Sequence, residues 1–128
     1  MAKQVLKPQG MVDAAPRAYS HGVRVGNLLF IAGQTAEPTG AEPAQGRFEA
    51  QVRQVFRNIE TVLREAGGSL EHLVTMTVFI TDMRYAQEFL RLRGEILQRD
   101  FPASALIGVR ELVNPHALLE IQSVAALD

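Results

Sequence analysis

The sequence predicts one α+β domain in which two helices cover the same face of a single mixed β-sheet. Two segments each show one apolar stripe at helical spacing, and several short apolar segments of strand length surround them. No repeat, low-complexity tract or linker divides the 128 residues. A helix with one apolar stripe buries only that stripe, so both helices can pack on one sheet face. We therefore treat residues 1–128 as a single domain with the element order β-β-α-β-α-β-β.

The first third of the chain predicts an arm, a hairpin and a loop. Residues 1–18 are rich in Pro and Ala and lack periodicity, which indicates an extended arm. Residues 21–25 alternate as a strand does, and Gly26-Asn27 then forms a two-residue hairpin turn. Residues 28–32 are continuously apolar, which is typical of a strand buried on both faces. The glycines and prolines of residues 33–46 predict a loop.

The clearest helix covers residues 47–66. Its apolar stripe consists of Val52, Val55, Phe56, Ile59, Val62, Leu63 and Ala66. Gly67-Gly68 is expected to end this helix, because glycine adopts the left-handed cap conformation without strain.

A strand and a second helix follow. Residues 73–80 predict a strand, and its even positions form an apolar face. These positions are Val74, Met76, Val78 and Ile80. Asp82 can cap a second helix. The apolar residues of that helix repeat at Tyr85, Phe89, Leu92 and Ile96. Two further strands are predicted near residues 104–110 and 117–126.

The second face of the predicted sheet has no cover within the chain. This face would include Thr75 and Thr77, and the doubly apolar segment 28–32 also needs cover there. We therefore expect the protein to oligomerise through its sheet.

Composition excludes several classes of function. The chain has 13 Lys and Arg against 14 Asp and Glu, so the basic surplus of a general nucleic-acid-binding protein is lacking. No cysteine is present, which excludes disulfides, thiolate metal sites and a cysteine nucleophile. No apolar segment has the length of a signal peptide or a membrane span. These features lead us to expect a cytoplasmic protein that has no membrane partner.

Glu120 is the most unusual residue of the sequence. It lies in the apolar segment 117–125, where strand parity places Leu119 and Ile121 on one face and Glu120 on the other. One interpretation is an exposed sheet face. The other is a general base or water-positioning group in a half-buried cleft, because burying an unused carboxylate is costly.

The three histidines do not form a metal-ligand pattern. His21, His72 and His116 lie far apart in the sequence, which favours structural or surface roles. His21 is of more interest because Tyr19 and Ser20 adjoin it. A Ser-His-Asp arrangement there is weakly supported, since no acidic residue is close in sequence.

Nearly the whole chain resembles the Rid (YjgF/RidA, reactive intermediate deaminase) family. Residues 19–34 (YSHGVRVGNLLFIAGQ) are similar to the family pattern YS-x-A-V-x-V-G-N-L-x-F-x-S-G-Q, and residues 51–67 resemble its first helix. Residues 74–83 (VTMTVFITDM) are close to VKTTVFLTDM. Phe101-Pro102-Ala103 and Leu119-Glu120-Ile121 fall where the family has F-P-A-R and V-E-I-E.

The resemblance implies a chorismate-mutase-like subunit, a homotrimer and clefts between neighbouring subunits. It also implies hydrolysis of enamines and imines, such as 2-aminoacrylate, to ketoacids and ammonia without a metal or other cofactor. In such proteins an arginine binds the substrate carboxylate and a glutamate holds the attacking water. A tyrosine, a serine and backbone groups of the S-G-Q turn line the pocket.

The site residues carry over one at a time. Tyr19 matches the tyrosine, Gly33 matches the glycine of the turn, and Glu120 matches the water-binding glutamate. We expect Glu120 and Tyr19 to be catalytic. The remaining expected substrate-binding residues are Gly33, Ala32, Ser104, Arg17 and His21.

The chain also departs from the family pattern. Ser104 replaces the arginine of F-P-A-R, Ala32 replaces the turn serine, and Gln122 replaces the second glutamate of E-I-E. The loop around residues 113–116 is one residue longer than usual. The sequence therefore indicates a branch that lacks the substrate-binding arginine.

Three arginines are candidates to replace the missing charge. Arg110 is six residues from Ser104, which is about 20 Å along a strand, so it cannot bind the same atom from that strand. Arg17 and Arg24 are better candidates because both lie near Tyr19 in the sequence. For all three, a solvated surface position is the alternative.

Two classes of function remain open at this stage. The first is a cofactor-free hydrolase that acts on an imine, an enamine or a related C–N compound, and that is weak on 2-aminoacrylate. The alternative is a non-catalytic trimer that senses a metabolite or binds a protein. Endoribonuclease or translation-inhibitor activity is disfavoured by the near-neutral charge.

Overall fold

The computed structural model describes residues 2–36 and 48–128, which form a six-stranded sheet with the strand order β1-β2-β3-β6-β4-β5. The strands are β1 (Gln4–Leu6), β2 (Gly22–Val25), β3 (Leu28–Gln34), β4 (Leu73–Ile80), β5 (Ala103–Gly108) and β6 (Leu119–Ala126). All neighbours are antiparallel except β4 and β5, which are parallel and are joined through α2.

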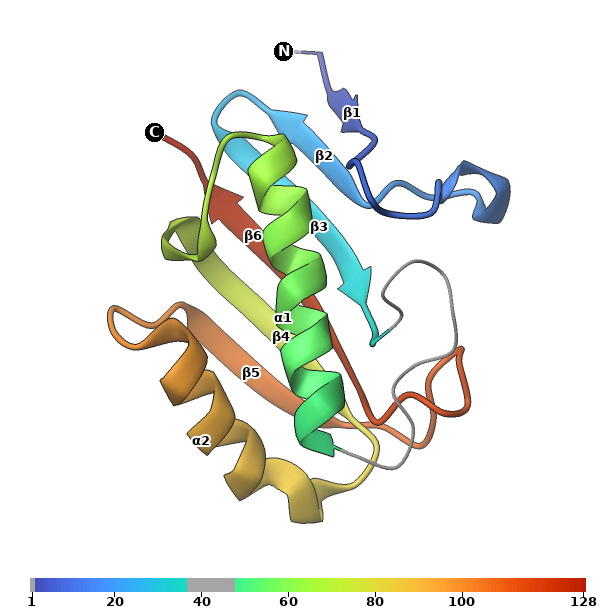
Figure 1. Ribbon diagram of the computed structural model, residues 1–128, viewed down its shortest axis with the longest axis vertical. Coiled ribbons are helices and arrows are strands. Elements are labelled where there is room, and N and C mark those ends of the chain that lie inside the picture. Colours follow the sequence, from blue (N-terminus) through green and yellow to red (C-terminus); the bar gives the residue numbers. More distant parts are fainter. Residues whose placement is uncertain (1, 37–47) are drawn as a thin grey trace.

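Two α-helices lie on one face of this sheet, as predicted (Figure 1). They are α1 (Phe48–Glu65) and α2 (Ala86–Leu97). Three single-turn helices, η1 (Ala15–Arg17), η2 (Leu70–His72) and η3 (Met83–Tyr85), occupy the connections. None of the helices in the described ranges is long and apolar enough to span a bilayer.

The core lies between α1, α2 and the covered sheet face. All predicted stripe residues of α1 from Val52 to Leu63 are buried, and Ala66 packs against them. Phe89 and Leu92 of α2 are fully buried. They meet the inward positions of the sheet, which include Leu29, Ile31, Met76, Val78, Ile80, Leu119 and Ile121. The helical and strand periodicities of the sequence therefore point to the same interior.

The end of α1 is a Schellman cap at the predicted glycines. The Gly67 N–H donates to the Arg64 carbonyl, the Gly68 N–H donates to the Leu63 carbonyl, and Gly67 has a φ of +80°. Asp82 also caps as expected, but the turn it begins is η3, which leads directly into α2.

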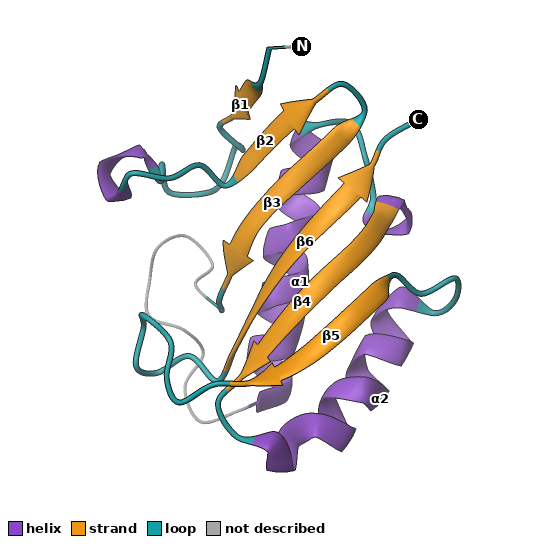
Figure 2. Ribbon diagram, turned by 180° about the vertical axis from the view of Figure 1, so that it is seen from behind, coloured by secondary structure: helices purple, strands orange, loops and turns teal. Residues whose placement is uncertain are grey.

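The interpretation of residues 28–32 as a strand buried on both faces is wrong for the isolated chain. Leu29 and Ile31 face the helices and are buried, whereas Leu28 is 40% exposed and Phe30 is 46% exposed. Both exposed side chains lie on the uncovered face of the sheet, which Figure 2 shows from the side opposite the helices. The apolar run therefore reflects a sheet face that none of the described residues covers.

The regular face predicted for residues 73–80 is interrupted at its start. The pairing of β4 with β6 shifts register between Leu73 and Thr75, and the irregularity leaves Val74 half exposed. From Met76 onward the predicted alternation holds.

The N-terminal arm has more regular structure than predicted, because it contains the strand β1 and the helical turn η1. β1 pairs with β2, which places the buried Leu6 opposite Gly22. Gly33 and Gln34, expected in a loop, belong to β3. The rest of that expected loop, residues 37–46, lies outside the described residues, as does residue 47 of the predicted helix.

Replacing Gly67 with Ala tests the helix cap. The left-handed conformation is unfavourable for a residue with a Cβ, so Gly67→Ala is expected to lower the free energy of unfolding by about 1 kcal/mol. Gly94→Ala in α2 is the matched control. There the added methyl group meets no neighbouring side chain within 4 Å, and stability should rise by about 0.5–1 kcal/mol. Urea denaturation measures both, and equal effects would contradict the assigned cap.

Candidate functional site

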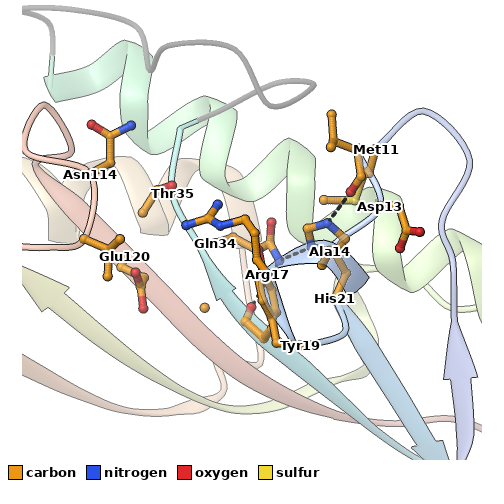
Figure 3. Close-up of a pocket in the computed structure, with 14 residues that line it drawn as sticks. Met11, Asp13, Ala14, Arg17, Tyr19, His21, Gln34, Thr35, Asn114 and Glu120 are labelled. Carbon is orange, nitrogen blue, oxygen red and sulfur yellow. Dashed lines mark hydrogen bonds between the residues drawn. The ribbon is translucent and has the colours of Figure 1, made fainter.

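A cleft of about 360 Å³ opens where β3 ends beside the start of β6. Its walls come from three parts of the chain: residues 11–21, the end of β3, and the segment that runs from Val113 into β6. Figure 3 shows Glu120 and Asn114 on one side of the cleft, with Arg17, Tyr19 and His21 on the other.

Glu120 reaches the cleft from the uncovered face of the sheet. In β6 its neighbours Leu119 and Ile121 are fully buried, and Glu120 itself is half-buried on the opposite face, opposite Phe79 of β4. This is the strand parity that the sequence predicted. The carboxylate therefore sits on a rigid central strand and not on a loop.

An irregularity in β3 brings the backbone against this carboxylate. Ile31 pairs with Ser123 and Gln34 pairs with Ile121, so two residues of β3, Ala32 and Gly33, lie opposite one residue of β6. A Cβ built on Gly33 would overlap the Glu120 carboxylate. The missing side chain at position 33 thus provides the space in which the carboxylate lies.

The N-terminal arm supplies the cationic group of the cleft. After η1, Ala18 adopts the left-handed conformation with a φ of 64°, and Tyr19 follows directly. The Arg17 guanidinium carbon lies 5.9 Å from the centroid of the Tyr19 ring. Within residues 2–36 and 48–128 the guanidinium makes no hydrogen bond or ion pair, so its donors face the cleft without a protein acceptor.

His21 connects the arm to β3. Its Nε2 lies 2.9 Å from the Val12 carbonyl oxygen, and its Nδ1 lies 3.3 Å from Nε2 of the buried Gln34. The Tyr19 ring meets the imidazole edge-on, with the ring centroids 5.6 Å apart.

Six of the seven predicted site residues line this one cleft. They are Arg17, Tyr19, His21, Ala32, Gly33 and Glu120. The exception is Ser104, which lies on β5 at the far edge of the sheet and is separated from β3 by β6 and β4. A single chain therefore does not bring Ser104 to Glu120.

Ser104 contacts an arginine that the sequence analysis did not consider. Its Oγ accepts a hydrogen bond of 2.6 Å from Nη1 of Arg93 in α2. The Arg93 guanidinium also lies 5.0 Å from the ring centroid of Phe89, and partial burial lowers the pKa of Arg93. The side chain at position 104 is therefore already next to a positive charge.

Of the three arginines considered as replacements for the missing charge, only Arg17 lines the cleft. Arg24 donates to the carbonyls of Gly26 and Ala66, which ties the β2–β3 turn to the end of α1. Arg110 is exposed in the segment after β5 and is not among the cleft residues.

Sequence reasoning missed several residues of the cleft wall, among them Asp13, Gln34 and Asn114. The Asp13 carboxylate accepts a hydrogen bond from the Ala15 N–H just before η1, and an Asp shortly before Ala15-Pro16 could have indicated such a turn. The Asn114 side chain accepts from the His116 N–H and shapes its own loop. Gln34 is the last residue of the 19–34 motif, which predicted only a turn at this position.

The cleft offers carboxylate, hydroxyl and guanidinium groups. Such a set can hold a water molecule at Glu120 and an anionic group at Arg17. In the part of the chain that the structure describes, no three His, Cys, Asp or Glu side chains gather as metal ligands would. The remaining histidines lie elsewhere: His72 is 3.3 Å from the Asp128 carboxylate, and His116 is exposed.

Comparison with known proteins gives relatives over the whole chain. The family model described as Endoribonuclease L-PSP matches residues 12–127. A RutC family protein of Pyrococcus abyssi is 31% identical over 98% of each chain. A protein of Dermatophagoides farinae named 2-iminobutanoate/2-iminopropanoate deaminase is 28% identical over 86% of each chain.

A solved structure extends the similarity to three dimensions. The crystal structure of the Rid family protein YyfA from Yersinia pestis superposes with a TM-score of 0.90 at 28% identity, and covers 98% of this chain and 100% of its own. Fold, sequence motifs and family model agree over the same residues. The chain therefore belongs to the Rid (YjgF/RidA) family, which the matching model describes as Endoribonuclease L-PSP.

Proposed function

We propose that this protein is a homotrimeric hydrolase that converts an imine, an enamine or a related C–N compound into a carbonyl compound and ammonia. The observation that carries the proposal is the position of the Glu120 carboxylate, which lies against the Gly33 backbone and across the cleft from Arg17. The Dermatophagoides farinae relative, a protein named 2-iminobutanoate/2-iminopropanoate deaminase, supports the same reaction class.

In the proposed reaction Glu120 positions and deprotonates a water molecule. The water oxygen bonds to the imine carbon, the imine nitrogen takes up a proton, and a tetrahedral aminoalcohol forms. Through Glu120, the hydroxyl proton then moves to the amino nitrogen, the C–N bond breaks, ammonia leaves with the bonding electron pair, and the carbonyl group forms. An enamine enters the same sequence after protonation of its second carbon. Such general-base assistance contributes about 10²–10⁴-fold to a rate.

Arg17 and Tyr19 are proposed to hold the substrate. Arg17 has no acidic protein partner within the described residues, so a ligand carboxylate could accept its donors in a charge-assisted contact. The Tyr19 ring supports the guanidinium from one side. The preferred substrate is therefore anionic, and its charged group lies at the arm side of the cleft.

Activity on 2-aminoacrylate is proposed to be weak. The family resemblance places an arginine at position 104, where this chain has Ser104. A guanidinium–carboxylate contact is worth about 1.5–3 kcal/mol, and a serine hydroxyl cannot provide the charge. A small substrate such as 2-aminoacrylate, whose carboxylate would bind an arginine at position 104, is therefore expected to bind weakly.

A non-catalytic metabolite-binding trimer is the second candidate. The observation that favours it is that Ala32 and Ser104 replace two of the family's polar site residues while the cleft itself persists. Ammonia release from a panel of imines, measured beside ligand-induced thermal shifts, separates the two. Binding without turnover of any imine supports the second candidate.

The trimer is proposed to bury the uncovered sheet face. Thr77→Arg places a charge in the middle of this face and is expected to yield monomers, because an unpaired buried charge is costly. Thr61→Arg on the outer side of α1 is the control and should keep the mass of three chains. Light scattering measures both, and a monomeric wild-type protein at micromolar concentration would refute the trimer.

Glu120→Gln tests the role of the carboxylate. This change keeps the shape and removes the base, so the rate of ammonia release should fall about a hundredfold or more with little change in melting temperature. Gly33→Ala should lower the rate as well, because the added methyl group displaces the carboxylate. Gly94→Ala, where the methyl group meets no neighbouring side chain within 4 Å, serves as the control. Full activity together with a lowered melting temperature in Glu120→Gln would indicate a structural glutamate.

Restoring the family arginine tests the effect of Ser104. Because Arg93 already contacts Ser104, a new guanidinium at position 104 would meet an existing one. The informative variant is therefore Ser104→Arg combined with Arg93→Gln, and Arg93→Gln alone is the control. The double variant is expected to hydrolyse 2-aminoacrylate about tenfold faster than wild type or more. Wild-type turnover equal to that of the double variant would contradict the argument.

A further inference from the structure

We propose that His21 is a positioning residue. Its neutral imidazole ties the N-terminal arm to β3 and thereby sets where Arg17 and Tyr19 stand in the cleft. That substrate binds in this cleft rests on the proposed function. The attachment through His21, called the tie below, rests only on the hydrogen bonds of its ring to Val12 and Gln34.

Among the described residues, the part of the arm that follows β1, residues 11–17, has one hydrogen bond to the rest of the fold, and His21 provides it. Residues 11–17 contribute Met11, Val12, Asp13, Ala14 and Arg17 to the cleft wall. Their other hydrogen bonds are local, within residues 8–18. In the part of the chain that the structure describes, the contact of His21 Nε2 with the Val12 carbonyl is the only hydrogen bond from residues 11–17 to any residue beyond Ala18.

The two partners of His21 select one state of its ring. A carbonyl oxygen only accepts, so Nε2 must carry the hydrogen in the contact with Val12. Nδ1 is then the acceptor for the side-chain N–H of Gln34. The same Gln34 nitrogen also donates to the Ala32 carbonyl, which fixes the orientation of the buried amide. The arrangement therefore fits the neutral imidazole with its hydrogen on Nε2.

Both ring nitrogens are thus used by the protein, which argues for positioning and against direct substrate binding by His21. The coupling to the cleft runs through the Tyr19 ring. This ring meets the imidazole edge-on and also lies beside the Arg17 guanidinium, and all three side chains line the cleft (Figure 3). Loss of the tie would displace the cation and the tyrosine together.

Hydrogen exchange of the arm tests the proposal without any assay of activity. His21→Phe keeps a ring beside Tyr19 and removes both hydrogen bonds. The Arg17 and Ala18 amides, which are hydrogen-bonded within the arm, should exchange at least tenfold faster, while α1 is unchanged. His21→Gln can still donate to the Val12 carbonyl and should restore most of the protection.

Binding of pyruvate, a small carboxylate and the ketoacid that 2-aminoacrylate would give, provides the second readout. Its affinity should fall about tenfold in His21→Phe, as in Arg17→Gln, and should stay near wild type in His21→Gln. Arm exchange that is the same in wild type and His21→Phe would overturn the proposal. If wild type neither binds pyruvate nor hydrolyses any imine, the proposed function fails, and the exchange data still decide the role of His21.

Discussion

The pairing of β3 with β6 joins the N-terminal hairpin to the strands of the C-terminal half, and the cleft depends on it. Where this pairing is regular, Leu29 and Ile31 meet the buried side of β6 and close the core beneath α1. Where it becomes irregular, at Ala32 and Gly33, the backbone turns toward Glu120. One ladder therefore holds the fold together and creates the space in which the carboxylate lies.

Much of the fold could be predicted because local signals and burial agree. The stripe of α1, its glycine cap and the Gly26-Asn27 turn are each set by residues within a few positions of one another. The features that could not be predicted depend on distant partners. The irregularity at Val74 exists only against β6, and β1 exists only because β2 offers a free edge.

In the candidate site, too, the features set by nearby residues could be predicted and those that depend on distant partners could not. Strand parity alone was sufficient to place Glu120 on the opposite face from Leu119 and Ile121. No sequence pattern could show that Arg17 would line the cleft, or that Arg24 would instead donate to the Gly26 carbonyl of the β2–β3 turn and to the Ala66 carbonyl after α1, because these contacts join distant parts of the chain. Likewise, the contact between Ser104 and Arg93 joins a strand to a helix eleven residues away.

The strand order has a consequence for how the chain folds. β6 is the last of the six strands in sequence, yet it lies in the middle of the sheet between β3 and β4. Until β6 inserts, β3 and β4 each present an unpaired edge. The core beneath α1 then also lacks the apolar side chains that β6 contributes, such as Leu119 and Ile121. Contacts of such long sequence separation slow folding, and open strand edges favour association with other chains. The central strand that carries Glu120 is thus the element whose insertion completes both the sheet and the core, and with them one wall of the cleft.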